Sequence, residues 1–442
     1  MSFLICLLYV LLGTVIGCLL SLIPSLHIYN VAGFALLIWQ TSEHLIPYEF
    51  MPAFFMSMIV AFAFINTIPM TFMGAPDESA TVTILPGTKY LTTSRGFEAA
   101  VLTGVGSLAG IALLIPLTGF FFLILPYVHV ILSPHMHWVI GLVMVYMLMS
   151  EWPKGIGLGD NFWQRFKDAW GNLFAGIITF FFAGLLGLIV TSKSIVSHEM
   201  GFQNIMPVFV GLFAVPSIIQ NLLSREHIPA QHIPEDVELD WKTVGQSTFQ
   251  GGLGGLLAAY LPAVTAGIGG IIAGHATALR GDKIFIVSGG VSKVIYYVGA
   301  FMLLFSITPL TPAGIGRGGL AVILRPVFSA RPGDYWLMLA VVIFVGCLSM
   351  LLMMRFAKWT LALLAKIDYR NLYIGAAVLV FAIIIGLTGL PGLFVATVAT
   401  LIGSIPVFYH CRRSNCMAVL LVPIALNMAG YGSDILDLLG LV

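Results

Sequence analysis

Apolar stretches recur along the whole chain, and short polar segments separate them. A run of about 20 apolar residues is long enough to cross the hydrocarbon core of a bilayer as a helix. The expected spans are residues 3–23, 51–68, 98–125, 136–150, 172–191, 203–223, 244–265, 284–306, 336–354, 372–388, 391–410 and 416–430. The pattern predicts an all-α polytopic membrane protein with about 10–14 transmembrane helices.

Three further stretches, residues 24–40, 69–92 and 266–280, fit neither spans nor ordinary loops. They are too polar or too short to cross a membrane, yet too apolar for surface loops. Irregular backbone survives at membrane depth only where protein buries it or water wets it. We therefore expect broken or re-entrant helices that line a cavity.

One spacing of two glycines and a proline occurs twice, each time within an apolar segment. Glycine lets helices approach closely, and proline breaks a helix. Matching breaks in two halves of a membrane protein point to a transporter's binding site, although packing glycines followed by a kink would give the same pattern. The positions are Gly13, Gly17 and Pro24 in the first half and Gly251, Gly255 and Pro262 in the second, an offset of 238 positions.

The spacing predicts two inverted repeats, residues 1–223 and 244–442. Residues 224–243 lie between them and contain five acidic and two basic residues. Pro229 and Pro234 prevent one continuous helix there. We interpret this segment as an acidic linker.

The composition excludes several classes of protein. The chain of 442 residues is 59% hydrophobic and 9% charged, with a net charge of +1, whereas soluble domains are roughly 25% charged. Nothing in this balance indicates nucleic-acid binding. The cysteines and histidines lack the spacing of a metal site, and no catalytic arrangement is evident, so we expect neither a metal nor an enzyme.

The densest polar stretch of the first half runs from Asn66 to Lys89. Its prolines and glycines interrupt any regular helix, which leaves backbone groups free to bind ions. Asp77 and Glu78 could hold a coupling sodium ion or carry a coupling proton. The alternative is a surface loop in which Asp77 or Ser79 caps the next helix.

Positive charge exceeds negative charge near the broken stretches. Lys293 lies inside an apolar run, and an intramembrane charge is a functional candidate by default. Thr265 begins a glycine-rich segment that could unwind, and Arg280 follows it. The excess favours an anionic substrate, a carboxylate or nearly as well a phosphate. The cations are Lys89, Arg95, Arg280, Lys283, Lys293, Arg317 and Arg325, and the anions are Asp77, Glu78, Glu98 and Asp282.

Two basic stretches predict the orientation of the C-terminal end. Two expected spans with a turn near residues 389–392 separate the stretches, so both fall on one side of the membrane. The positive-inside rule assigns that side to the cytoplasm. The stretches contain Arg355, Lys358, Lys366 and Arg370, and Arg412 and Arg413.

Four motifs, in order over nearly the whole chain, resemble the large membrane subunit of the tripartite tricarboxylate transporter family, closest to its stand-alone archaeal-type branch. They are GTVIGCLLSLIPSLHIYN (13–30), NTIPMTFMGAPDESATVTILPG (66–87), GDKIFIVSGGVSK (281–293) and IGSIPVFYHCRRSNCMAVLLVP (402–423). The resemblance implies a membrane permease with two related halves that moves carboxylate-type anions with an ion gradient.

The resemblance also implies individual motif positions and partners. Ser25 and Ala263 stand where the family pattern has glycine, which restricts positive-φ backbone and close ligand approach. Tricarboxylate members of the family work with a small membrane subunit and an extracytoplasmic binding protein. The motif positions are Pro24, His27, Asn30, Asn66, Pro69, Gly74, Pro76, Asp77 and Pro86.

The sequence therefore predicts a secondary active transporter, a symporter of the cell membrane, for a small anion. A proton or sodium gradient would drive it by alternating access around a site near the midplane. Membrane lipid and a second copy of the chain are further expected partners. The expected substrate-binding residues are Pro24, Ser25, His27, Asn30, Asn66, Lys89, Thr265, Arg280 and Lys293, and the expected coupling-ion residues are Asp77 and Glu78.

Two other functions remain open at this point. A translocase (flippase) of a phosphorylated polyprenyl lipid carrier would use the same cationic cavity and open sideways to the bilayer. A membrane-embedded enzyme acting on lipid-linked substrates has less support, because no paired carboxylates or nucleophile–base arrangement occurs at helical spacing.

Overall fold

The computed structural model describes a chain that is mostly helical. It describes all residues except 1, 24–25, 27, 42–45, 74–78, 80–82, 154, 156, 194, 197–200, 225–227, 317–318, 326–327 and 442. Across the described residues the β contacts amount to one isolated bridge between Thr308 and Thr311. The predicted all-α fold is confirmed.

Two compact units divide the chain, and each combines segments that are distant in sequence. Unit 1 holds residues 1–130 and 225–373, and unit 2 holds residues 131–224 and 374–442. Each unit thus draws on both predicted repeats. The domain boundaries at 1–223, 224–243 and 244–442 stay a prediction.

The helices of unit 1 are α1 (Ser2–Ser21), α2 (Ile28–Thr41), α3 (Met51–Ile65), α4 (Thr67–Phe72), α5 (Ile84–Thr92), α6 (Gly96–Leu123), α12 (Trp241–Tyr260), α13 (Ala266–Thr277), α14 (Asp282–Val294), α15 (Ala300–Met302), α16 (Gly319–Leu324) and α17 (Asp334–Leu364). Those of unit 2 are α8 (Met136–Met149), α9 (Phe162–Ser192), α10 (Gly201–Phe209), α11 (Val215–Leu223), α19 (Ala418–Met428) and α20 (Gly432–Leu438). α7 (Leu125–Leu132) and α18 (Tyr369–Phe408) cross the unit boundaries.

Nine helical stretches in the described part of the chain are long and apolar enough to cross a membrane. A bent pair, Arg413–Ala429 with Gly432–Leu438, would add a tenth. The expected span at 244–265 corresponds to α12, which has enough residues but is not one of the nine. The nine are Phe3–Ser21, Tyr48–Phe72, Gly96–Leu123, Leu125–Met149, Phe162–Ser192, Asn204–Leu223, Asp282–Phe305, Asp334–Leu364 and Tyr369–Phe408.

α18 is too long to be a single span. Its 40 residues would extend about 60 Å at 1.5 Å per residue, twice the roughly 30 Å hydrocarbon core. Gly389 has non-helical backbone angles (φ 65°, ψ −164°) and divides the element into two helices. The break lies where the sequence predicts a turn between two spans.

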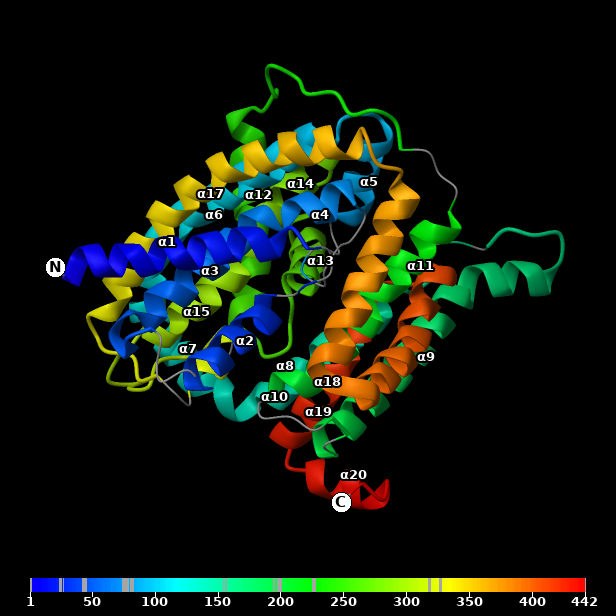
Figure 1. The fold of residues 1–442 in the computed structure, drawn as a ribbon. Coiled ribbons are helices and arrows are strands. Elements are labelled where there is room, and N and C mark those ends of the chain that lie inside the picture. The colour runs from blue at the N-terminus through cyan, green and yellow to red at the C-terminus, as the bar shows by residue number, and fades with distance from the viewer. Residues whose placement is uncertain are drawn as a thin grey trace. The chain divides into compact units, whose positions relative to one another are not determined.

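Two helices from opposite halves of the sequence form the centre of unit 1. α3 packs against α1 and α17, and α14 packs against α12 and α6 (Figure 1). All side chains of α3 are buried, as expected for a helix that is apolar on every face. Each central helix therefore contacts one helix from its own half and one from the other half.

The repeated glycines make the same type of contact in both halves. A Cβ at any of the four would lie within 3.0 Å of a backbone oxygen of the facing helix. The facing residues are themselves related by one offset, 234 positions. The inverted orientation of the repeats stays a prediction. The contacts join Gly13 to Phe54, Gly17 to Met58, Gly251 to Ser288 and Gly255 to Ser292.

Residues 228–240 are not helical and run along unit 1 as a strap. In the sequence, this strap lies at the start of the second half. The side chain of Gln231 accepts a hydrogen bond from Gly96 N (2.8 Å) and donates one to Leu91 O (2.9 Å). Lys283 Nζ donates to the carbonyl of Glu238 (2.7 Å). The strap therefore ties the corner between α5 and α6 to the start of α14.

Candidate functional site

A lysine from the second half of the sequence contacts the junction of α3 and α4 in the first half, inside unit 1. The side chain of Lys293, near the end of α14, is 2% exposed. Its Nζ donates a hydrogen bond to Thr67 Oγ1 at 2.9 Å. Thr67 is the first residue of α4, directly after Asn66, whose helical backbone joins α3 to α4. The contact joins positions that are 226 residues apart.

The backbone beyond Lys293 is irregular. α14 passes into a π-helical turn at Ile295–Gly299, and such turns are frequent at functional sites. Burying an ammonium group is costly unless it is paired. Thr67 supplies a neutral hydroxyl as one hydrogen-bond acceptor of this ammonium group.

A helix break lies between α12 and α13, at Pro262 and the residues after it. Thr265 caps α13, and its Oγ1 accepts from Ile268 N at 3.4 Å. Ser292 Oγ donates to Ala266 O at 3.3 Å, which brings the start of α13 beside the turn that carries Lys293. Amide groups at a helix start favour anions. We call Thr67, Thr265, Ser292 and Lys293 the buried end of the site.

Ala263 corrects one expectation from the sequence. Loss of the family's glycine was expected to restrict positive-φ backbone, yet Ala263 adopts φ +60°. A left-handed conformation costs a non-glycine residue roughly 1–2 kcal/mol. Packing around Pro262 therefore holds Ala263 in a left-handed conformation, which a glycine at this position would adopt without the strain.

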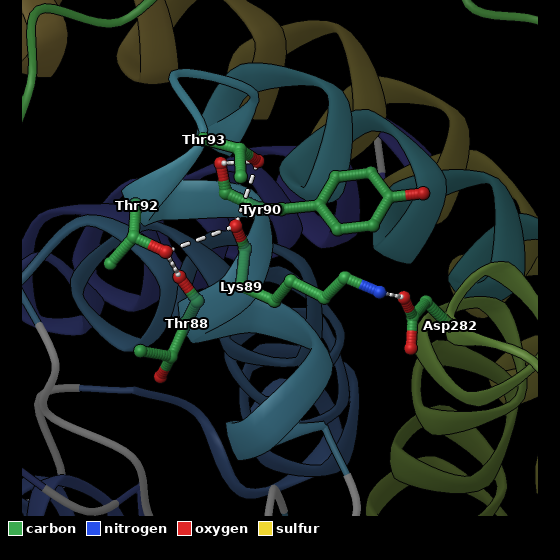
Figure 2. Close-up of polar contacts among 6 residues, drawn as sticks. All are labelled: Thr88, Lys89, Tyr90, Thr92, Thr93 and Asp282. Atoms are coloured by element: carbon green, nitrogen blue, oxygen red, sulfur yellow. Dashed lines mark hydrogen bonds and ion pairs between the residues drawn. The ribbon is translucent and has the colours of Figure 1, made fainter.

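Lys89 lies at a second, exposed place. It forms an ion pair with Asp282, the first residue of α14 (Figure 2). The side chains of Lys89 and Asp282 are 66% and 37% exposed. The Thr93 hydroxyl donates to the Lys89 carbonyl at 2.8 Å, which fastens the last turn of α5.

Arg280 lies near this exposed ion pair in sequence and caps a helix. Its Nη1 donates to Gly274 O (2.7 Å) and Leu279 O (3.2 Å), at the C-terminal end of α13. Positive side chains are favourable at that end of a helix. We call Lys89, Arg280 and Asp282 the exposed end of the site.

Lys89 and Lys293 do not converge on one anion. Asp282, which holds Lys89, and Lys293 occupy α14 11 positions apart, or about 16 Å along the helix axis. A small carboxylate cannot contact both ends at once in this arrangement. The structure brings Lys293 and Thr265 to one end and Lys89 and Arg280 to the other.

The remaining predicted residues divide into two groups. Asn30 and Asn66 are both buried, in α2 and at the end of α3. Pro24, Ser25, His27, Asp77 and Glu78 lie outside the described residues. Their predicted roles therefore stay predictions, as does a meeting of Pro24 with Pro262.

Arg95 and Glu98, two of the charges near the broken stretches, form an ion pair with each other. Arg95 binds the Glu98 carboxylate through two hydrogen bonds of 2.7 Å each. These bonds raise the pKa of Arg95. The guanidinium also lies over the ring of Tyr90, 4.6 Å from its centroid. The pair fixes the start of α6.

Comparison with known protein families identifies the chain. Residues 7–418 match the Tripartite tricarboxylate transporter TctA family. The chain belongs to this family.

Other comparisons agree with the TctA assignment. An uncharacterized protein of Methanocaldococcus jannaschii is 24% identical over 427 residues, which cover 94% of this chain and 97% of that protein. No solved structure matches the chain. The family consists of transporter permeases, and the spanning helices agree with a multi-pass protein of the cell membrane. The match lends no support to the polyprenyl-phosphate translocase.

Residues of the motif at 402–423 take part in a polar network in unit 2 that was not predicted from the sequence. Arg413 donates to Ser217 Oγ (2.5 Å) and Gln220 Oε1 (2.8 Å) of α11. Glu151 accepts from Arg412 N at 2.6 Å and from Asn415 at 3.2 Å. The side chain of Arg413 thus holds α11 by hydrogen bonds within unit 2. Arg413 is therefore weaker evidence for the cytoplasmic side under the positive-inside rule.

Sequence reasoning also missed Thr67, Ser292 and Gln250. Thr67 and Ser292 were visible only as neighbours of Asn66 and Lys293, and a hydroxyl in an apolar run carries little signal alone. Gln250 is 1% exposed in α12. An amide within a predicted span was a usable signal, because polar groups at membrane depth are costly.

Proposed function

We propose that this TctA-family protein is a secondary active transporter for a small carboxylate anion. The observation that carries the proposal is Lys293, an ammonium group buried to 2% exposure against Thr67, where helices of both halves meet. A buried cation in a polytopic membrane protein is expected to serve function. A carboxylate is the complement that the tricarboxylate family assignment favours.

In this mechanism the anion binds at the buried end. Lys293 supplies the charge, Thr67 a hydroxyl, and the start of α13 after Thr265 the positive end of a helix dipole. Proton or sodium binding at Asp77 and Glu78 couples transport to a gradient. Alternating access exposes the site to each side in turn.

Each unit combines segments of both predicted repeats. Interleaved repeats are typical of transporters that work by alternating access. A small membrane subunit and an extracytoplasmic binding protein are proposed partners from the family assignment, and a homodimer is a proposed assembly.

Asp77→Asn tests the coupling part of the proposal. Uptake driven by a proton or sodium gradient should be lost in proteoliposomes, because an amide neither carries a proton nor supplies a negative charge. Expression and thermal unfolding should stay at wild-type values. Gradient-driven uptake at the wild-type rate would refute the role of Asp77.

A screen of anions tests the substrate class. Citrate-like acids should raise the thermal unfolding temperature of the purified protein, while polyprenyl phosphate should not compete with them. Stabilisation by polyprenyl phosphate alone would refute the carboxylate assignment.

A further inference from the structure

The start of α9 extends beyond the packed part of unit 2. The buried residues of α9 begin at Leu173, and residues 162–172 include none. A Cβ at Gly171 would meet no described atom within 4 Å, whereas one at Gly176 would lie 3.0 Å from Asn415 Nδ2. Figure 1 shows the loop before α9 and its first turns at the outer edge of unit 2. The packing of α9 against other helices of the unit therefore begins at Leu173.

α9 is also longer than the hydrocarbon core is thick. Its 31 residues extend about 46 Å at 1.5 Å per residue, whereas the core measures roughly 30 Å and the bilayer with its headgroups about 40–45 Å. The apolar part of the helix, the expected span at 172–191, fills the core. Residues 162–171, which include the charged side chains of α9, therefore lie at the level of the headgroups.

The loop before α9 is fastened to these first turns. Asp168 Oδ2 accepts a hydrogen bond from Leu158 N at 2.8 Å, and Arg165 Nε donates one to Gly159 O at 2.8 Å. The side chain of Asn161 caps the helix by accepting from the backbone amide of residue 164 at 2.9 Å. The loop and the first turns thus form one folded segment, residues 157–170, which we call the arm.

The arm exposes large apolar side chains although it lies outside the hydrocarbon core. Leu158, Phe162 and Trp163 are 82%, 71% and 68% exposed. Contiguous exposed apolar surface outside the core marks a site that binds a protein or a membrane. The arm therefore requires a partner with an apolar surface.

The aromatic side chains of the arm continue a stripe that begins in the span. The ring centroids of Trp163 and Phe166 lie 6.3 Å apart, and those of Phe166 and Trp170 lie 6.0 Å apart. Phe166 also contacts the ring of Phe174 at 6.3 Å. Steps of three and four residues place the members on one face of α9. The stripe consists of Trp163, Phe166, Trp170, Phe174, Ile177 and Phe181.

The same face of α9 contacts lipid where the helix crosses the membrane. Phe174, Ile177 and Phe181 are exposed there, whereas Thr179 and Ala183 on the opposite face are buried within unit 2. Because the stripe is continuous, the aromatic face of the arm points in the same direction as the lipid-facing side of the span. This continuity indicates that the bilayer covers the arm.

The chemistry of the arm suits the boundary between headgroups and acyl chains. Tryptophan is enriched at that boundary, because its ring is apolar and its N–H needs a polar partner. Lys167 lies four residues after Trp163 and three before Trp170, so it flanks the stripe. A lysine stem follows apolar surface while its ammonium group reaches lipid phosphate. This complementarity favours a bilayer over an apolar helix as the partner.

We propose that the arm lies in the headgroup region of the bilayer and anchors unit 2 there. Trp163, Phe166 and Trp170 enter the boundary between headgroups and acyl chains, and Lys167 contacts lipid phosphate. The arm thereby fixes the depth of α9 in the membrane. This anchoring does not rest on the proposed transport function.

Tryptophan fluorescence of the full-length protein in liposomes tests the arm. The liposomes contain phosphatidylglycerol and phosphatidylcholine that is brominated either close to the headgroup or deep in the acyl chain. The chain has eight tryptophans, so the signal of Trp163 is the difference between the wild type and Trp163→Phe. Bromines close to the headgroup should quench this signal at least about twofold more than deep bromines, because interfacial groups lie about 5–10 Å into the boundary.

Lys167→Glu tests the contact with phosphate. Anionic headgroups repel a carboxylate and move the indole toward water, so quenching of the Trp163 signal by acrylamide should rise about twofold. Lys193→Glu is the matched control, because Lys193 is an exposed lysine directly after the other end of α9. It should give the wild-type value. An unchanged value in Lys167→Glu, or an equal rise in both variants, would overturn the phosphate contact.

Three quenching patterns of the wild type would overturn the bilayer as the partner. Strong quenching of the Trp163 signal by acrylamide without quenching by bromine would place the arm in water. Stronger quenching by deep bromines would place it inside the hydrocarbon core. Protection from both quenchers would mean that protein covers Trp163, as a second copy of the chain would do.

Discussion

The buried end and the exposed end of the site both carry positive charge, yet their surroundings differ. Lys293 is enclosed in unit 1 against Thr67, and Lys89 faces solvent on Asp282. Exposed ion pairs contribute about 0–1 kcal/mol, whereas a buried charge acts in a low dielectric where each interaction is stronger. Function should therefore depend on Lys293 far more than on Lys89.

The largest expected effect comes from removing the buried charge. Lys293→Met should lower carboxylate uptake in proteoliposomes by at least about 30-fold, because a buried charge-assisted contact is worth about 2–5 kcal/mol. Lys89→Met is the matched control and should lower uptake less than about twofold. Equal losses in the two variants would contradict the distinction between the two ends.

A smaller effect is expected from the hydroxyl that holds Lys293. Thr67→Val keeps the shape of the side chain and removes the hydroxyl that accepts from Lys293 Nζ, at a cost of about 1–3 kcal/mol. Carboxylate affinity should weaken by about tenfold, measured as the anion-induced shift in unfolding temperature. Thr71→Val, at another buried threonine of α4, should leave affinity unchanged. A Thr67→Val protein with normal affinity would remove Thr67 from the site.

The two left-handed alanines next to α13 sharpen the comparison. Ala263 precedes this helix at φ +60°, and Ala278 follows it at φ +54°. Glycine adopts such angles without steric cost but loses more entropy on folding. Both Ala263→Gly and Ala278→Gly should thus stabilise the protein by about 0.5–1 kcal/mol in thermal unfolding.

Only Ala263→Gly, at the buried end, should also alter uptake, since strained backbone is concentrated at functional sites. If Ala278→Gly changes uptake equally, the strain at Ala263 has no special role.

The smallest effect is expected at the exposed ion pair. A double-mutant cycle of Lys89→Met and Asp282→Asn, followed by thermal unfolding, should give a coupling below about 1 kcal/mol. Salt at 1 M should reduce it further. A larger coupling that resists salt would mean that this pair is screened from solvent in the membrane.

The sequence predicted the architecture well for a physical reason. Membrane-spanning helices are defined locally, by the length and polarity of one continuous stretch. The paired spans around Gly389 and the helix break at Pro262 were predicted in this way and are found. The predicted interruption between Asn66 and Pro69 is wrong, because the helix continues through Asn66 to Phe72. The repeated glycines were also visible locally, although their facing residues were not.

The site was predicted only in part, because a binding site depends on which helices pack together. Lys293 and Thr265 were identified as isolated polar residues in apolar surroundings. Their neighbours Thr67 and Ser292, and the amide of Gln250, gain meaning only from contacts with other helices.

Three things followed from the sequence by itself: the membrane as solvent, the helical class and the TctA resemblance. Hydrophobicity and motifs are written along the chain, so no packing is needed to read them. Only the tertiary structure decided that Lys89 and Arg280 lie apart from Lys293. The rise of 1.5 Å per residue turns 11 positions of α14 into about 16 Å, and the packing of α13 and α14 determines which polar groups lie at each end.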